Sequence, residues 1–249
     1  RNSVWNCGIL PVYRQQLYSV YGEYKNTARE FFATVNLTHN REWYNRIYEQ
    51  RIENGQVQRV SLPLSNHGSG YTVKSTLSKG FYELGLKTSF LVLLNISKAE
   101  QISGGQRLPY QYRLMRLEPK VIWTPNRHWE TSYQTDIRYG GNKIGERTRL
   151  APLWNVTQQV QLSYISSPIE ASLSVDHYHN DVNEDQSVNA VFADFSVSWK
   201  SGRWQITTTA TNLFDKRTYA YTQYASLESY TSWVRIRPRE FLVAIRYQL

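Results

Sequence analysis

Residues 129–139 read Trp-Glu-Thr-Ser-Tyr-Gln-Thr-Asp-Ile-Arg-Tyr, so that aromatic, aliphatic or threonine side chains occupy every second position. Successive side chains of a β-strand point to opposite faces, so this alternation predicts a strand with one apolar and one polar face. The same period of two recurs at 84–96, 169–176, 191–199 and 240–249. No segment carries a sustained helical stripe. The sequence therefore predicts an all-β protein with antiparallel strands.

The strands predicted from this alternation are long. Globular strands average about five or six residues, whereas a tilted strand that crosses a membrane needs roughly nine to eleven. Long strands of this kind are typical of a transmembrane outer-membrane β-barrel. Eleven strands are predicted, at 10–23, 28–48, 57–77, 83–97, 107–124, 128–140, 148–165, 168–180, 186–199, 203–213 and 235–249.

The connections between these strands alternate between short and long, as in barrels with tight periplasmic turns and longer external loops. Short turns are predicted near 24–27, 78–80, 125–127, 166–168 and 200–203, and long ones near 49–56, 98–107, 140–147, 180–186 and 214–234. Aromatic residues fall beside both kinds of connection and predict two interface belts. Examples are Trp129, Tyr164, Trp199 and Trp204 near short turns, and Tyr110, Tyr139 and Tyr178 near long ones.

Composition excludes several classes of protein. A single Cys7 in 249 residues cannot form a disulfide scaffold. The longest apolar run, residues 90–94, is far shorter than the roughly 20 residues of a membrane helix. The mean hydropathy of −0.56 is compatible with a barrel, whose strands alternate in polarity. The net charge of +9 comes from scattered cations rather than a basic stripe, so nucleic acid is not expected as a partner.

The last part of the chain resembles the TonB-dependent outer-membrane receptors. Residues 209–219 read Thr-Ala-Thr-Asn-Leu-Phe-Asp-Lys-Arg-Thr-Tyr, similar to the N-L-F-D-K-x-Y stretch of that family. Residues 237–241, Arg-Pro-Arg-Glu-Phe, are similar to its P-R entry to the final strand. The apolar alternation from Val243 to Leu249 resembles the family's C-terminal assembly signal, which usually ends in Phe. The resemblance covers roughly the last 45 residues.

This resemblance implies a 22-stranded barrel filled by an N-terminal plug and energised through TonB. Eleven strands, or twelve if residues 1–9 add one, are about half of that number. We therefore expect residues 1–249 to be the C-terminal barrel segment of a transporter in the bacterial outer membrane, with the plug outside this chain. The chain begins at Arg1 without Met, which suggests that an upstream part has been removed or left out.

The expected partners are outer-membrane lipid, the remaining barrel half with its plug, the TonB complex acting through the plug, and a surface lipoprotein. The expected cargo is a large nutrient such as a siderophore, a glycan, a peptide or cobalamin. The alternatives are a complete barrel of about 12 strands serving as a pore, export channel or outer-membrane enzyme, a barrel serving as an adhesin or scaffold, and a soluble β-sandwich or propeller.

Two groups of residues are candidates for the functional site. Aromatic residues of the last long loop either contact a ligand or pack on one another: Tyr219, Tyr221, Tyr224, Tyr230 and Trp233. Charged residues expected from strand phase to face the lumen either line a substrate path and hold the plug, or form a solvated wall. These are Lys87, Glu130, Asp136, Arg138, Glu170, Asp176, Glu240 and Arg246.

No enzymatic constellation is expected. None of the five His residues can be placed beside a nucleophile by strand phase, and the chain has no Gly-x-Ser-x-Gly, P-loop or Gly-x-Gly-x-x-Gly sequence. His177 and His179 lie near acidic residues, but their spacing matches no recognised metal-binding loop. The sequence thus predicts neither a catalytic residue, a metal site nor a cofactor.

Overall fold

The computed structural model describes residues 4–5, 10–53, 56–145, 148–149, 152–224 and 229–248. Nearly all of them lie in β-strands, and the helical element among them is a single 3-10 turn at Tyr82–Leu84. Within these residues no helix is long and apolar enough to cross a membrane. The prediction of an all-β protein is confirmed.

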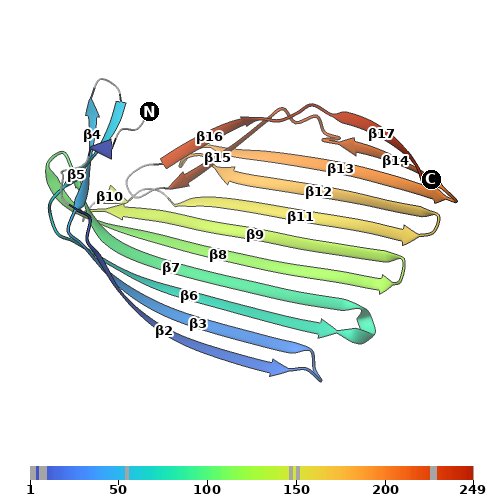
Figure 1. The fold of residues 1–249 in the computed structure, drawn as a ribbon, viewed down its shortest axis with the longest axis horizontal. Coiled ribbons are helices and arrows are strands. Elements are labelled where there is room, and N and C mark those ends of the chain that lie inside the picture. The colour runs from blue at the N-terminus through green and yellow to red at the C-terminus, as the bar shows by residue number, and fades with distance from the viewer. Residues whose placement is uncertain are drawn as a thin grey trace.

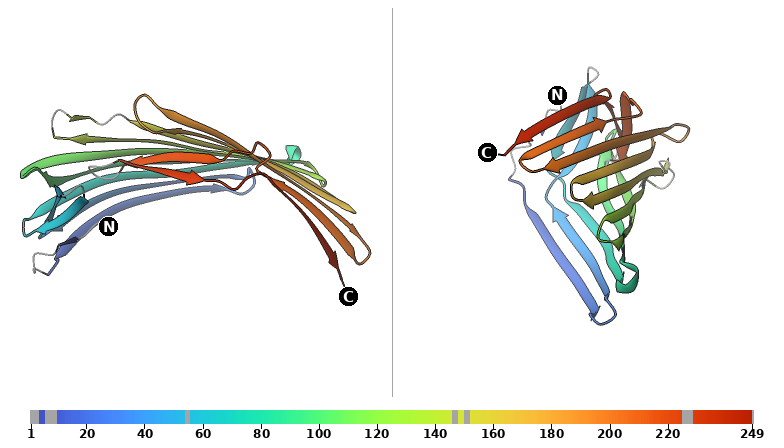
Figure 2. Two further views of the ribbon diagram at one scale, coloured as in Figure 1. Left: turned by 90° about the horizontal axis from the view of Figure 1, so that it is seen from above. Right: turned by 90° about the vertical axis from the view of Figure 1, so that its right-hand side faces the viewer.

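Eleven long strands form one antiparallel sheet, here called the wall, in which each strand pairs with the next along the chain (Figure 1). The wall is a single bowed layer (Figure 2). Its strands are β2 (Tyr13–Asn26), β3 (Phe31–Tyr44), β6 (Asn66–Phe81), β7 (Leu86–Ser103), β8 (Gln106–Asn126), β9 (Trp129–Ile144), β11 (Leu153–Ser166), β12 (Ile169–Asp181), β13 (Ser187–Ser201), β14 (Trp204–Thr211) and β17 (Glu240–Tyr247).

Two hairpins and two short bridges lie outside this row of eleven strands, although one hairpin pairs in parallel with the end of β7 and one bridge pairs with the end of β9. They are the hairpins β4 (Ile47–Glu53) with β5 (Gln56–Leu62) and β15 (Thr218–Tyr224) with β16 (Ser229–Arg235), and the bridges β1 (Val4–Trp5) and β10 (Thr148–Arg149). The predicted strands 28–48 and 57–77 are therefore each divided, and the predicted loops 49–56 and 214–234 each hold a hairpin. Strand β1 pairs in parallel with β5, so it is not a twelfth wall strand.

One end of the wall carries only tight turns, at residues 27–30, 82–85, 127–128, 167–168 and 202–203, close to their predicted positions. This is called the tight-turn end, and the opposite one the long-connection end. The expectation of a long loop at 98–107 is wrong. Strands β7 and β8 continue there and are joined by Gly104 and Gly105, both with positive φ.

The pairing register aligns the alternating side chains of neighbouring strands, so the wall has two continuous faces. Apolar residues pair across strands in rows, for example Leu37-Val73-Leu94-Met115-Tyr139 and Leu162-Leu173-Phe195-Ala210-Phe241. We call the side formed by these rows the apolar face and the opposite side the polar face.

Aromatic pairs bracket the apolar face. Near the tight turns, Trp129 lies 4.8 Å from Tyr164 between ring centroids, and Trp204 lies 4.8 Å from Tyr247. Toward the long-connection end, Tyr139 lies 4.7 Å from Trp154. The prediction that Tyr110 and Tyr178 belong to an interface belt is wrong, because the register places both on the polar face.

The wall has almost no core. The accessible surface of the whole chain is 17042 Å², whereas a globular protein of 29.2 kDa would expose about 11,400 Å². In the edge strand β17, Phe241 and Ile245 remain 69% and 66% exposed. A sheet one layer thick cannot bury its apolar face within itself, so that face requires an external apolar environment.

Candidate binding pocket on the polar face

The register places all eight charged residues of the second candidate group on the polar face. Each pairs with another polar-face residue, as in Asp136 opposite Thr157 and Asp176 opposite Gln159. That this face lines a lumen stays a prediction. The eight residues are Lys87, Glu130, Asp136, Arg138, Glu170, Asp176, Glu240 and Arg246.

Four charged groups form a cluster on β8 and β9, and two of them, Asp136 and Arg138, belong to the predicted eight. Asp136 accepts hydrogen bonds from Arg116 (Nη2 to Oδ2, 3.0 Å) and from Arg138 (Nη2 to Oδ2, 2.7 Å). Arg116 also forms an ion pair with Glu118. Two guanidinium groups are thus balanced by two carboxylates, so the cluster is electrically neutral but rich in directional donors.

The hairpin β15–β16 lies across the polar face and is tied to it by hydrogen bonds (Figure 2). The amide of Asn180 on β12 donates to the hydroxyl of Tyr219 (2.9 Å) and to the carbonyl of Ala220 (3.1 Å). Thr222 donates to the carbonyl of Val182 (3.1 Å). Asn180, Ala220 and Thr222 are at most 3% exposed. The last long loop is therefore folded onto the wall as a hairpin.

The base of the hairpin is held by Asn212, which we call the clasp residue. Its side-chain amide donates to the carbonyls of Lys216 (2.9 Å) and Arg237 (2.8 Å), and its Oδ1 accepts from the Lys216 backbone (3.0 Å). Asn212 has φ of 50°, a left-handed conformation that Asn tolerates better than most residues. It therefore joins the two ends of the loop.

Asp215 makes a second link at the same place. Its carboxylate accepts from the backbone N–H of Arg239 (3.0 Å) and forms an ion pair with Arg217 (2.9 Å). The hydrogen bond from Arg239, with that from Arg217, holds the pKa of the Asp215 carboxyl below its ordinary value, so the group stays charged at neutral pH. The Asn-Leu-Phe-Asp and Pro-Arg motifs, separate in the sequence, are thus parts of one structure.

A pocket of about 480 Å³ lies where the hairpin meets the polar face. Tyr219 and Tyr221 line it from the hairpin, and the Arg116-Asp136-Arg138 cluster lines it from the wall. Asn155 also lines it, and its buried Oδ1 has no hydrogen-bond partner in the structure. Hydroxyls, guanidinium groups, a carboxylate and a free amide acceptor therefore surround one space, which suits a polar ligand with several hydrogen-bonding groups.

The five aromatic residues of the last long loop do not all lie in this pocket. Tyr219 and Tyr221 line this pocket, whereas Tyr230 and Trp233 are 51% and 68% exposed. The side chain of Tyr224 lies outside the described part of the chain. Sequence reasoning missed Arg116, Asn155 and Asn180. Arg116 could not be placed from the tight turn alone, because a register shift between Trp123 and Asn126 changes its partner on β9, which is Arg138.

The clasp gives a first prediction. Asn212→Ala should destabilise the hairpin by about 2–4 kcal/mol, because it removes three hydrogen bonds made by a buried side chain and places Ala in a left-handed conformation. Amide hydrogen exchange of residues 218–224 should then quicken, with the strands of the wall unchanged. Asn212→Gly keeps the conformation and loses only the hydrogen bonds, so it should show a smaller increase. Unchanged exchange in both variants would contradict the role assigned to the clasp.

The described residues contain no group of three or more His, Cys, Asp or Glu side chains that could hold a metal ion. His179 instead contacts Asn189 (2.9 Å) and Asp181 (3.4 Å). Comparisons with known proteins do not identify the chain, since no family model, no curated protein and no solved structure matches it.

Proposed function

We propose that this chain is the C-terminal half of the barrel wall of a TonB-dependent transporter, which imports a large nutrient across the outer membrane. The observation that carries the proposal is a single-layer sheet of eleven strands, nine of them 13 to 21 residues long, with a continuous apolar face and two unpaired edges. The Asn-Leu-Phe-Asp and Pro-Arg motifs, which the clasp residue joins, are the reason for proposing this family.

The height of the apolar face fits a membrane. On β7, outward-facing positions run from Leu86 to Ile96, ten steps along the strand that span about 33 Å at about 3.3 Å per residue. A strand tilt of about 40° reduces this to roughly 25 Å, the height of the apolar band in outer-membrane barrels. Aromatic pairs lie near both limits, as they do at membrane interfaces.

The edges favour a half-barrel over a complete small one. In a closed barrel of this chain alone, β2 would pair with β17. Among the described residues, β2 pairs only with β3, and β17 only with β14. Both edge strands are exposed along almost their whole length. An unpaired edge exposes backbone donors and acceptors, which in a membrane must be satisfied by further strands.

Membrane insertion and the missing half are tested together. We expect the protein to float with phosphatidylcholine vesicles in a density gradient, and to be extracted with a mass that includes further barrel strands and a plug. A protein that remains soluble without detergent would overturn the membrane assignment. A floating species of 29.2 kDa alone would support the complete small barrel instead.

Dependence on TonB is tested by uptake. Cells that carry the protein should lose growth on its nutrient when TonB is deleted, while the protein remains in the outer membrane. Growth that continues without TonB would favour a diffusion pore.

The pocket gives a second prediction. Tyr221→Ala should weaken nutrient binding about tenfold, because it removes one wall of the pocket and a hydroxyl. Trp233→Ala is the matched control, since this aromatic residue of the same hairpin is exposed and does not line the pocket. Nutrient binding is measured with the purified protein. Equal losses of affinity in the two variants would contradict the assignment of this pocket as the binding site.

A further inference from the structure

A row of cations crosses the apolar face near the long-connection end. The register joins Arg41, Ser69, Lys98, Gln111 and Lys143, which lie on β3, β6, β7, β8 and β9. Neighbouring strands lie about 4.8 Å apart, so the three cations recur about every 10 Å with a hydroxyl or an amide between them. We call these five residues the basic row.

The basic row lies next to the aromatic limit of the apolar face. The adjacent row contains Tyr18, His39, Tyr71, Ile96 and Arg113, and the row after that contains Val20, Leu37, Val73, Leu94 and Met115. His39 stacks on Tyr71 at 4.3 Å between centroids and accepts a hydrogen bond from Arg41 Nε (3.2 Å). The order apolar, aromatic, basic is that of a membrane core, its interface and its charged headgroups.

No carboxylate in the described part of the chain neutralises the basic row. Among the described residues, Arg41, Lys98 and Lys143 form no ion pair with a carboxylate. Glu100, the nearest acidic group on this face, is bound to Arg107 at 3.1 Å. Glu42 belongs to the polar face and accepts from Tyr44 (2.7 Å).

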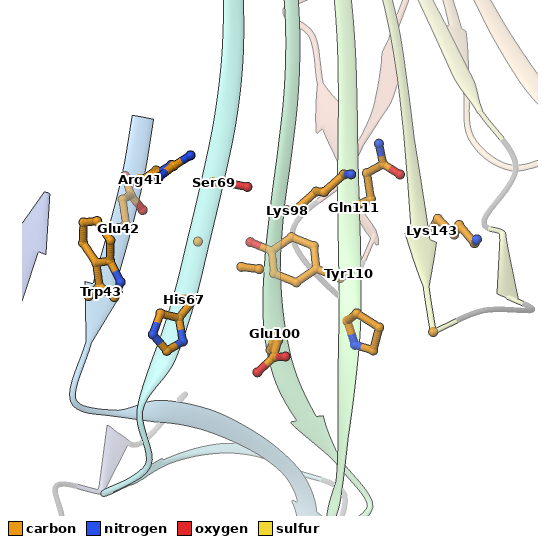
Figure 3. A pocket seen from close by; sticks show the side chains of 14 residues that line it. Arg41, Glu42, Trp43, His67, Ser69, Lys98, Glu100, Tyr110, Gln111 and Lys143 are labelled. Atoms are coloured by element: carbon orange, nitrogen blue, oxygen red, sulfur yellow. The ribbon is translucent and has the colours of Figure 1, made fainter. Parts of the chain in front are cut away.

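The row also borders a hollow. A pocket of about 550 Å³ is lined mostly by apolar-face residues from these strands, among them the five of the basic row with His67 and Glu100, and also by Glu42 of the polar face (Figure 3). Lys and Arg side chains are long enough for two cations about 10 Å apart to reach one anion between them. The hydroxyl of Ser69 and the amide of Gln111 add donors at the intervening positions.

We propose that the basic row binds the phosphate groups of a membrane lipid whose headgroup carries phosphate monoesters, in the leaflet at the long-connection end. The acyl chains would cover the apolar rows below, and the phosphates would lie beyond the aromatic row. This inference rests on the proposed membrane location, but not on transport or on TonB.

The test compares two triple variants of the full protein in detergent. Arg41→Gln/Lys98→Gln/Lys143→Gln removes the cations of the basic row. Lys74→Gln/Lys87→Gln/Lys120→Gln removes the same charge from the polar face of β6, β7 and β8. Binding of diphosphoryl lipid A is titrated by native mass spectrometry. The first variant should bind about a hundredfold more weakly, the loss expected for three cations at an anionic surface. The second should match the unmodified protein.

Further arms identify the ligand. Monophosphoryl lipid A and phosphatidylglycerol should bind more weakly than the diphosphoryl lipid, and inorganic phosphate should not displace it. Equal binding by both variants, or displacement by inorganic phosphate alone, would overturn the lipid site. Flotation with vesicles is measured in parallel. A protein that floats but shows no selective lipid binding refutes this inference only, whereas one that does not float refutes the proposed membrane location as well.

Discussion

Val92→Arg is expected to destabilise the membrane-inserted protein by about 2–4 kcal/mol, because it places a guanidinium group in the middle of the apolar face. Val92 pairs with Leu117 and Ser75 in a row of that face. The free energy of unfolding would be measured by urea titration of the protein in lipid vesicles. Such a loss is a large fraction of the total free energy of unfolding of most proteins.

The matched control lies one residue away. Leu91 belongs to the polar face and pairs with Glu118 across β7 and β8. Leu91→Arg inserts the same side chain beside a carboxylate, so it should cost less than about 1 kcal/mol. A cost that is equal for the two variants, or larger for Leu91→Arg, would mean that the apolar face does not meet lipid.

The second large effect is expected at a tight turn. Gly85 has φ of 59°, and a Cβ built on it would lie 2.1 Å from the backbone carbonyl oxygen of Thr124. That oxygen belongs to the neighbouring strand β8 and cannot move aside as a side chain would. Gly85→Ala should therefore destabilise the protein by about 3 kcal/mol or more, measured as a lower urea midpoint.

Gly202 separates the two causes of this effect. It has φ of 57° at another tight turn, and nothing lies within 4 Å of the Cβ position. Gly202→Ala retains the cost of a left-handed conformation, about 1 kcal/mol, without the contact. Similar losses in the two variants would show that the approach to Thr124 is unimportant.

The arrangement of the wall could be predicted because it follows from local pattern. Alternation in segments such as 129–139 determines which side chains share a face, and the tight turn at 127–128 makes β8 and β9 neighbours. From these two properties the position of Asp136 and Arg138 on one face follows without further information. The predicted eleven long strands correspond to the eleven strands of the wall.

The pocket could not be predicted in the same way, because its contacts join distant segments. The hydrogen bond from Asn180 to Tyr219 spans 39 residues, and nothing local to either residue indicates it. The loop 214–234 was predicted from its long spacing alone, which does not show that β15–β16 folds back onto the wall. Arg116 lies in a stretch where apolar residues continue on both faces, so its place on the polar face emerges only with the register.

The two ends of the hairpin β15–β16 lie side by side where the chain leaves the wall and returns to it. One hydrogen bond joins them there, from the Ile236 N–H to the Arg217 carbonyl (3.0 Å). Asn212 and Asp215 hold these two ends together from outside the hairpin. We therefore expect that the segment 218–235 can be exchanged for another hairpin without altering the strands on either side. On the proposed function, exchange of this one short insert would change the ligand specificity of the transporter. Grafting inserts between positions 217 and 236 offers a direct route to re-engineer it.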